Sequence, residues 1–154
     1  MADEKGYGIQ IEGLDEMIKA FDESPEKVGK VLQDTTIEAG KQIQREAVKE
    51  APHAFGNLQK SIHMEYSPIQ VEVSARAEYA SYVEMGTKPH SINPQVLEKW
   101  AAKTGANPYA VARSIRTRGT KANPFMQRTK DKLTESIQDM FVKATEIIKN
   151  LLSK

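Results

Sequence analysis

The sequence predicts an α+β fold: a small antiparallel β-sheet packed by a long N-terminal helix and a long C-terminal helix, with a short helical insert. Two observations carry this prediction. Apolar residues recur every three or four positions over residues 25–50 and again over 125–151, as on one face of a helix. Between these stretches, residues 69–76 alternate apolar and polar side chains, as in a strand with one buried face. Strands and helices in separate parts of a chain are typical of α+β domains.

Proline and glycine predict where the helices begin and end. A side-chain acceptor followed by proline indicates a helix start, because the acceptor caps the first amides and proline fits the first helical position. Such pairs are Ser24-Pro25, Asn93-Pro94, Asn107-Pro108 and Asn123-Pro124. The glycines Gly86, Gly105 and Gly119 predict helix ends, since glycine readily adopts the left-handed conformation.

The first third of the chain is predicted to hold a short strand at residues 7–11, a small helix, and then a long helix. The small helix carries Leu14, Met17, Ile18 and Phe21. The long helix runs from Pro25 to about Glu50, and Ala51-Pro52 ends it. Its narrow apolar stripe consists of Val28, Leu32, Thr35, Ala39, Ile43 and Ala47.

Two antiparallel strands are expected next, at residues 58–66 and 68–77, with a turn at Tyr66-Ser67-Pro68. Three short helices follow, at residues 79–85, 94–104 and 108–118, and the last helix begins after Asn123. The apolar stripe of that last helix continues nearly to the C-terminus. It consists of Leu133, Ile137, Met140, Phe141, Ala144, Ile147, Ile148 and Leu151.

Composition indicates a single domain, residues 1–154, with the helical insert at about 88–122. Hydrophobic residues make up 39% and charged residues 28% of 154, which is typical of a globular chain with a core of its own. The absence of cysteine excludes a disulfide framework and a thiolate metal site. No apolar run approaches the ~20 residues of a membrane-spanning helix, and the acidic start is unlike a secretory signal. We therefore expect a protein made in a reducing cytoplasm, without a cofactor.

The net charge of +1 is unevenly distributed along the chain. Residues 1–50 carry 7 basic and 12 acidic side chains (−5), residues 51–112 carry 5 of each, and residues 113–154 carry 10 and 4 (+6). Such a separation suits nucleic-acid binding or head-to-tail contact between identical subunits, and solvated helix faces are the alternative explanation.

The sequence carries no catalytic motif, and we expect no enzyme. The three histidines, His53, His63 and His90, are not spaced as metal ligands on one helix. Neither the G-x-S-x-G nucleophile turn nor the glycine-rich phosphate loop occurs. We therefore predict no catalytic residue and no metal ligand.

The stretch EYASYVEMGTKPH, residues 78–90, concentrates polar and aromatic side chains. Its Glu84 is the one carboxylate to consider as an acid or base, but it has no identifiable partner. We expect it instead to act as a structural brace, bound by the amides and hydroxyl of Met85-Gly86-Thr87. Tyr79 and Tyr82 could stack bases, but their helical spacing with Val83 favours packing against the sheet.

The segment 113–132 is strongly basic. Its Arg113, Arg116, Arg118 and Lys121 could neutralise phosphates, meet an acidic face of a neighbouring subunit, or remain solvated. The sequence leaves these three alternatives open.

Three stretches carry a family resemblance: EAVKEAPHAFGNLQKSI, VEVSARAEYASYVEMGT and GTKANPFMQRTKDKL. They resemble a tail-component family of long-tailed phages and prophages, the gene-product-ten-like tail-completion or head–tail joining proteins of lambdoid phages. The family pattern has a helix ending in Ala-Pro, a Gly-x-Leu-x-x-Ser-Ile strand entry, a Tyr-Ala-x-Tyr-Val-Glu-x-Gly-Thr helix end and a Pro-Phe helix start. The matching signature residues are Gly56, Leu58, Ser61, Tyr79, Tyr82, Glu84, Gly86, Thr87, Pro124 and Phe125.

The resemblance implies a structural role in the virion. Such proteins complete the tail at the neck, as a ring between the head connector and the tail tube, whose proteins are the implied partners. Because DNA passes through the neck, Arg113, Arg116, Arg118 and Lys121 are candidates to face DNA or the next subunit. The implied location is the neck of a virion assembled in a bacterial host, with no membrane contact. The alternative function is a small nucleic-acid-binding protein that uses residues 113–132.

Overall fold

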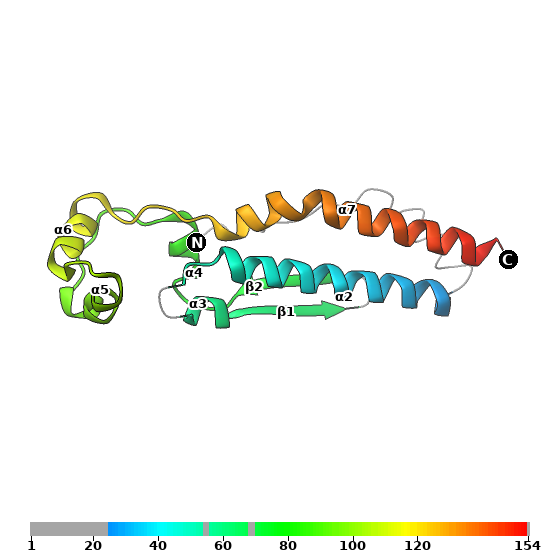
Figure 1. The fold of residues 1–154 in the computed structure, drawn as a ribbon, viewed down its shortest axis with the longest axis horizontal. Coiled ribbons are helices and arrows are strands. Elements are labelled where there is room, and N and C mark those ends of the chain that lie inside the picture. Colours follow the sequence, from blue (N-terminus) through cyan, green and yellow to red (C-terminus); the bar gives the residue numbers. More distant parts are fainter. Residues whose placement is uncertain (1–24, 54–55, 68–69, 154) are drawn as a thin grey trace.

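The computed structural model describes residues 25–53, 56–67 and 70–153, and it confirms the α+β class. Figure 1 shows an elongated molecule in which helix α2 (Pro25–Glu50) lies between helix α7 (Phe125–Leu152) and a two-stranded sheet. The sheet consists of β1 (Ile62–Ser67) and β2 (Gln70–Ala75). These three layers form the body of the molecule. The predicted strand at residues 7–11 and the small helix carrying Leu14 lie outside the described residues.

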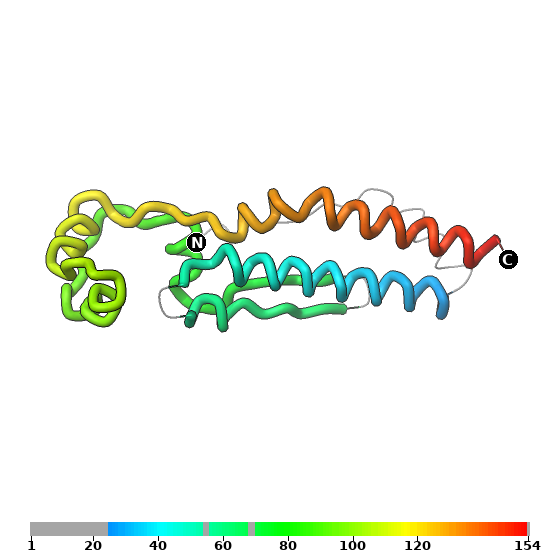
Figure 2. The backbone as a smooth tube through the Cα atoms, in the orientation of Figure 1, coloured from blue at the N-terminus to red at the C-terminus, as the bar shows by residue number. Residues whose placement is uncertain are grey.

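Helices α2 and α7 run antiparallel and form the larger hydrophobic core (Figure 2). Their predicted bounds are confirmed, and each buries one apolar stripe whose larger side chains contribute about 1.5–3 kcal/mol apiece. Three stripe positions are wrong. On α2, Thr36 is buried, whereas the half-buried Thr35 donates its hydroxyl to the Val31 carbonyl at 2.7 Å. On α7, Ile147 and Leu151 lie at the edge of the stripe and are exposed. The buried members of this core are Val28, Leu32, Ala39, Ile137, Phe141, Ala144 and Ile148.

The sheet lies close against α2. β1 and β2 pair antiparallel with Ile62 opposite Ala75 and Ser67 opposite Gln70, so the predicted turn at residues 66–68 begins too early: residues 66 and 67 belong to β1. A Cβ atom on Gly40 of α2 would overlap Val71 and lie 2.6 Å from the Met64 sulfur. Glycine therefore allows the helix to approach the sheet more closely than any other residue could.

A second core closes the end of the body, where α2 ends and α7 begins. Its buried residues are Ala47, Ala51, Leu58, Ile62, Ala80 and Phe125. The strand predicted from residue 58 is wrong in its first part, because residues 57–60 form a helical turn, α3 (Asn57–Lys60). Gly56, at φ 70°, starts this turn, and the Lys60 amide donates back to the Gly56 carbonyl at 2.9 Å. The turn carries Leu58 into the core.

Residues 88–119 form a lobe at one end of the molecule, joined to the body by two extended segments (Figures 1 and 2). The lobe contains a 3₁₀ turn, η1 (Pro94–Leu97), and helices α5 (Glu98–Thr104) and α6 (Pro108–Arg118). Two predicted caps are confirmed here. The Asn93 side chain accepts from the Gln95 amide at 3.0 Å, and the Asn107 side chain accepts from the Tyr109 amide at 2.9 Å.

Candidate functional site

The signature residues meet at one corner of the body, between the sheet, the short helix α4 (Ala80–Met85) and the start of α7. Leu58 and Phe125 are both buried in the second core. Ser61, at the end of α3, donates its hydroxyl to the Leu58 carbonyl at 2.7 Å. Residues that are far apart in the sequence therefore build a single corner.

The two tyrosines of this corner are exposed, which corrects the expectation that their spacing buries them against the sheet. Tyr79 is 45% exposed and Tyr82 is 61% exposed, whereas Ala80 and Glu84 are the buried residues of α4. The helix therefore presents a small residue and a carboxylate inward. Helical spacing predicts which residues share a face, but it does not say which face meets the core.

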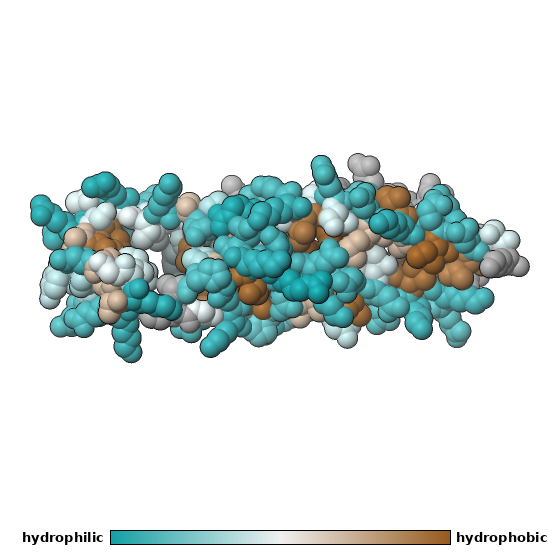
Figure 3. Space-filling model, in the orientation of Figure 1, coloured by the Kyte–Doolittle hydropathy of each residue, from teal (hydrophilic) through white to brown (hydrophobic). Residues whose placement is uncertain are grey.

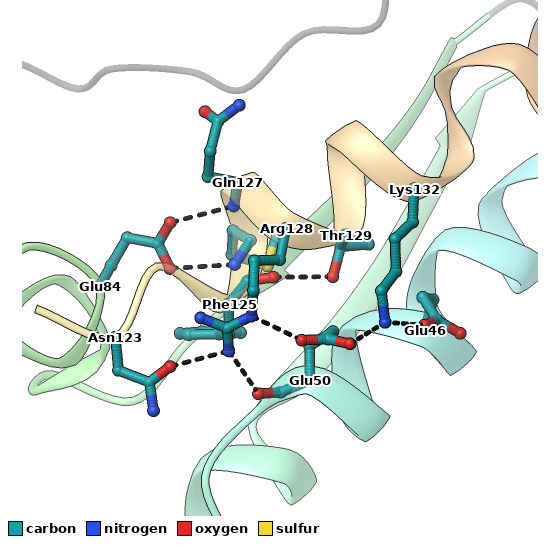
Figure 4. Close-up of polar contacts among 10 residues, drawn as sticks. Glu46, Glu50, Glu84, Asn123, Phe125, Gln127, Arg128, Thr129 and Lys132 are labelled. Atoms are coloured by element: carbon teal, nitrogen blue, oxygen red, sulfur yellow. Dashed lines mark hydrogen bonds and ion pairs between the residues drawn. The ribbon is translucent and has the colours of Figure 1, made fainter.

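Glu84 caps helix α7, which lies more than forty residues later in the sequence. Its two carboxylate oxygens accept from the backbone amides of Met126 and Gln127, each at 3.0 Å (Figure 4). The expectation that Glu84 is bound by Met85-Gly86-Thr87 is therefore wrong, because its partners are these two amides of α7. A negative charge at a helix N-terminus satisfies free amides and is attracted by the helix dipole. Glu84 is 7% exposed, so this cap is largely shielded from water.

Arg128 joins three segments next to this cap (Figure 4). Its Nε donates to the Glu50 carboxylate at 2.6 Å. Its Nη2 donates to the Glu50 backbone carbonyl at 3.1 Å and to the Asn123 side chain at 2.8 Å. Because Glu50 is the last residue of α2, this guanidinium satisfies a free carbonyl at the C-terminus of one helix from the first turn of another.

Lys132 extends the junction by one helical turn. Its ammonium group pairs with Glu46 at 3.2 Å and also with Glu50 (Figure 4). Hydrogen bonds from Lys132 lower the pKa of Glu46, and those from Arg128 and Lys132 lower the pKa of Glu50. The pKa of Lys132 is raised by its hydrogen bond to Glu50 and, to a smaller extent, by its hydrogen bond to Glu46. We call Glu46, Glu50, Arg128 and Lys132 the ion-pair junction.

We expect the ion-pair junction to make folding sensitive to acid. The carboxyl pKa values in the folded protein lie below the ordinary value of 4.5, so their stabilisation is fully present above that pH. It is lost as the pH falls through the lower folded-state values. Because the pKa of Lys132 is raised in the folded protein, its contribution to stability is fully present up to at least pH 10.5. Urea unfolding at a series of acid pH values measures the slope of the free energy of unfolding against pH. Lys132→Gln should make this slope shallower. An unchanged slope in that variant would contradict the assignment.

The two segments that join body and lobe are paired at a single point. The Thr87 amide donates to the Thr120 carbonyl at 3.1 Å, and the Thr120 amide donates to the Thr87 carbonyl at 3.2 Å. Their hydroxyls lie 2.9 Å apart. Gly86 and Gly119 flank this bridge at φ 74° and 76°, which confirms them as helix ends with positive φ. The bridge fixes where the lobe begins.

The predicted basic segment does not form one surface. Arg128 and Lys132 belong to the ion-pair junction of the body, whereas Arg113, Arg116 and Arg118 are exposed on α6 of the lobe and Lys121 is exposed on the returning segment. In the sequence, residues 88–119 carry six basic side chains and one acidic (+5), and the remaining residues carry 16 and 20 (−4). Positive charge is therefore gathered on the lobe.

The arginines differ between body and lobe. Arg45, Arg76 and Arg128 of the body each pair with a glutamate. In the part of the chain that the structure describes, the guanidinium groups of Arg113, Arg116 and Arg118 pair with no carboxylate. Glu98 is the single acidic residue of residues 88–119, so the lobe can hardly neutralise them from within.

A groove on the lobe collects two of these arginines. It has a volume of about 400 Å³ and lies between the segment that enters the lobe and helix α6. Tyr109, Arg113 and Arg116 line one side, and Ser91 and Pro94 line the other. We call it the basic groove. Its two guanidinium groups suit an anionic group.

The three histidines lie apart and make local contacts. The His53 ring bonds to the Gln59 side chain, His63 to the Ser61 carbonyl and His90 to the Lys88 carbonyl, at 2.8–2.9 Å. Among the described residues, no three histidine, aspartate or glutamate side chains are grouped to hold a metal ion.

Residues 15–86 match the family described as "Bacteriophage HK97-gp10, putative tail-component". The resemblance to a phage tail-component family is confirmed. The match spans α2, the sheet and α4, and it ends at Gly86, where the segment to the lobe begins. The lobe and α7 lie beyond the matched residues. No curated protein and no solved structure matches the chain.

The match indicates a component of the phage tail and a virion location, and a structural family of this kind indicates a non-enzymatic role. Within residues 25–53, 56–67 and 70–153, no helix is long and apolar enough to cross a membrane.

The sequence interpretation missed the ion-pair junction, although a signal for it exists. Glu46 and Glu50 are four residues apart at the end of one helix, and Arg128 and Lys132 are four apart at the start of another. Pairs with equal spacing and opposite charge are complementary when two helices lie side by side. The prediction took Arg128 and Lys132 as part of a basic run instead.

Proposed function

We propose that this chain is a structural virion protein that completes the tail at the neck of a phage or prophage particle. In this proposal it assembles as a ring between the head connector and the tail tube, and it has no catalytic role. The family match supports a tail component. The finer assignment to the neck rests on the difference in charge between the basic lobe and the described part of the body.

That difference is the observation that carries the proposal. A lobe of charge +5 projects from one end of an elongated molecule, whereas the described residues of the body carry 13 basic and 13 acidic side chains (Figure 1). Two unlike surfaces on one subunit suit a heterologous contact, in which one surface of each copy meets a different surface of the next. Such contacts close into a ring when the rotation allows it, and a ring is the shape required between a connector and a tube.

The location of the protein in particles tests this function. Particles from an induced culture of the bacterium that carries the gene would be purified on a density gradient and labelled with an antibody to the protein. We expect a small fixed copy number per particle and label at the junction of head and tail. Complete particles that lack the protein would overturn the proposal, and label along the tail would restrict it to another part of the tail.

A further inference from the structure

We propose that the basic groove of one copy binds an acidic face on helix α7 of the next copy. The inference deepens the proposed function, because it rests on a ring of identical subunits and names the two surfaces that meet in it. Each surface carries charge that the described part of the same chain leaves unpaired.

The acidic face is a row of carboxylates along α7, which we call the acidic ridge. Asp131, Glu135, Asp139 and Glu146 are all exposed, and their spacing of four, four and seven residues places them on one side of the helix. Like charges four residues apart repel each other on an isolated helix. Among the described residues, neither Glu135 nor Asp139 pairs with a cation. The ridge therefore gains most from an external cation at these two positions.

The two arginines of the basic groove have a spacing similar to that of the two carboxylates. Arg113 and Arg116 are three residues apart on α6, about 4.5 Å along the helix, and Glu135 and Asp139 are four apart on α7, about 6 Å. Two guanidinium groups can therefore face two carboxylates when the helices cross. Arginine is suited to this contact, since its planar group binds a carboxylate through two parallel hydrogen bonds.

A protein partner explains more of the structure than nucleic acid does. Phosphates would neutralise the groove but leave the acidic ridge unpaired, whereas a second copy satisfies both surfaces with one contact. Figure 3 shows hydrophilic side chains over most of the face displayed, on the body and on the lobe, so a contact guided by charge suits that surface. Because exposed pairs are individually weak, the contact gains strength when several copies close into a ring.

Charge reversal of each surface tests the contact in the purified full chain. The lobe variant is Arg113→Glu with Arg116→Glu, and the ridge variant is Glu135→Lys with Asp139→Lys. In sedimentation velocity at low salt, we expect the wild type to self-associate. Each variant alone should self-associate at least about tenfold more weakly than the wild type. An equimolar mixture of the two variants should associate again, since each reversed surface then meets its complement.

A matched control separates the contact from net charge. Lys27→Glu with Lys41→Glu makes the same change in charge as the lobe variant on exposed positions of α2, and we expect it to associate like the wild type. Thermal unfolding of every variant checks that the fold is retained.

A cross-link provides a second readout that does not depend on the reversed variants. The chain contains no cysteine, so an oxidised mixture of Arg116→Cys and Asp139→Cys protein can form a disulfide at these positions only between copies. We expect a mixed dimer, and little product from a mixture of Arg116→Cys with Lys41→Cys.

Three results would overturn the inference. The first is a wild type that neither self-associates nor gives the cross-link, and the second is a mixture of the lobe and ridge variants that does not associate. The third is a lobe variant that loses duplex DNA binding but still self-associates like the wild type. The last result would assign the basic groove to phosphates. None of these results depends on where the protein lies in particles, so a failure of the inference can be distinguished from a failure of the proposed function.

Discussion

Replacing Glu84 with alanine should lower the free energy of unfolding by about 2–3 kcal/mol. The substitution removes both acceptors from the amides of Met126 and Gln127. Loss of an N-cap costs about 0.5–2 kcal/mol, and a buried amide left without a partner adds about 1–3 kcal/mol. Because the cap connects α4 to the first turn of α7, the loss should loosen the corner where the second core lies. Urea unfolding followed by circular dichroism measures it.

Glu78 supplies the matched control for this substitution. It is an exposed carboxylate six residues earlier, just before α4, and Glu78→Ala should change the stability by less than about 0.5 kcal/mol. Glu84→Gln keeps one acceptor oxygen without the charge, so an intermediate loss would separate geometry from electrostatics. If Glu84→Ala unfolds at the same urea concentration as Glu78→Ala, the two hydrogen bonds contribute nothing and the cap assignment is wrong.

The fold was predictable wherever its signals are local. Both long helices were predicted close to their observed bounds, because the apolar stripe and the residues at the helix ends lie within the element itself. The caps at Asn93 and Asn107 follow from the same kind of signal. Even Gly86 and Gly119 were identified as helix ends from their residue type alone, since the positions require positive φ.

The corner was not predictable, because its decisive contacts join distant residues. Asn123-Pro124 looks like the helix starts at Asn93-Pro94 and Asn107-Pro108, yet the Asn123 side chain accepts from Arg128 and Glu84 takes over the capping of α7. Nothing in the sequence near Asn123 distinguishes it from Asn93. The orientation of α4 depends on the same long-range contact, since a carboxylate can be buried only where donors are waiting for it.

The bridge between body and lobe accounts for the second large effect. Replacing Gly119 with alanine should destabilise the protein by about 3 kcal/mol, or detach the lobe from the body. The residue has φ 76° and ψ −162°, a conformation that is essentially confined to glycine. In addition, its Cβ would overlap the Thr87 carbonyl oxygen and lie 2.8 Å from the Lys88 carbonyl carbon. Those atoms are backbone and can move only by breaking the pairing of Thr87 with Thr120.

Gly105→Ala separates the two causes of the stability loss expected for Gly119→Ala, which are backbone strain and overlap of the added Cβ atom. Gly105 also has positive φ, at 71°, but no atom lies within 4 Å of the position of its Cβ. Gly105→Ala should therefore cost only about 1 kcal/mol, from backbone strain alone. The difference between the two variants measures the close approach at the bridge, and hydrogen exchange of the Thr87 and Thr120 amides should be faster in Gly119→Ala alone. Equal losses in both variants, with unchanged exchange, would mean that the bridge does not hold the lobe in place.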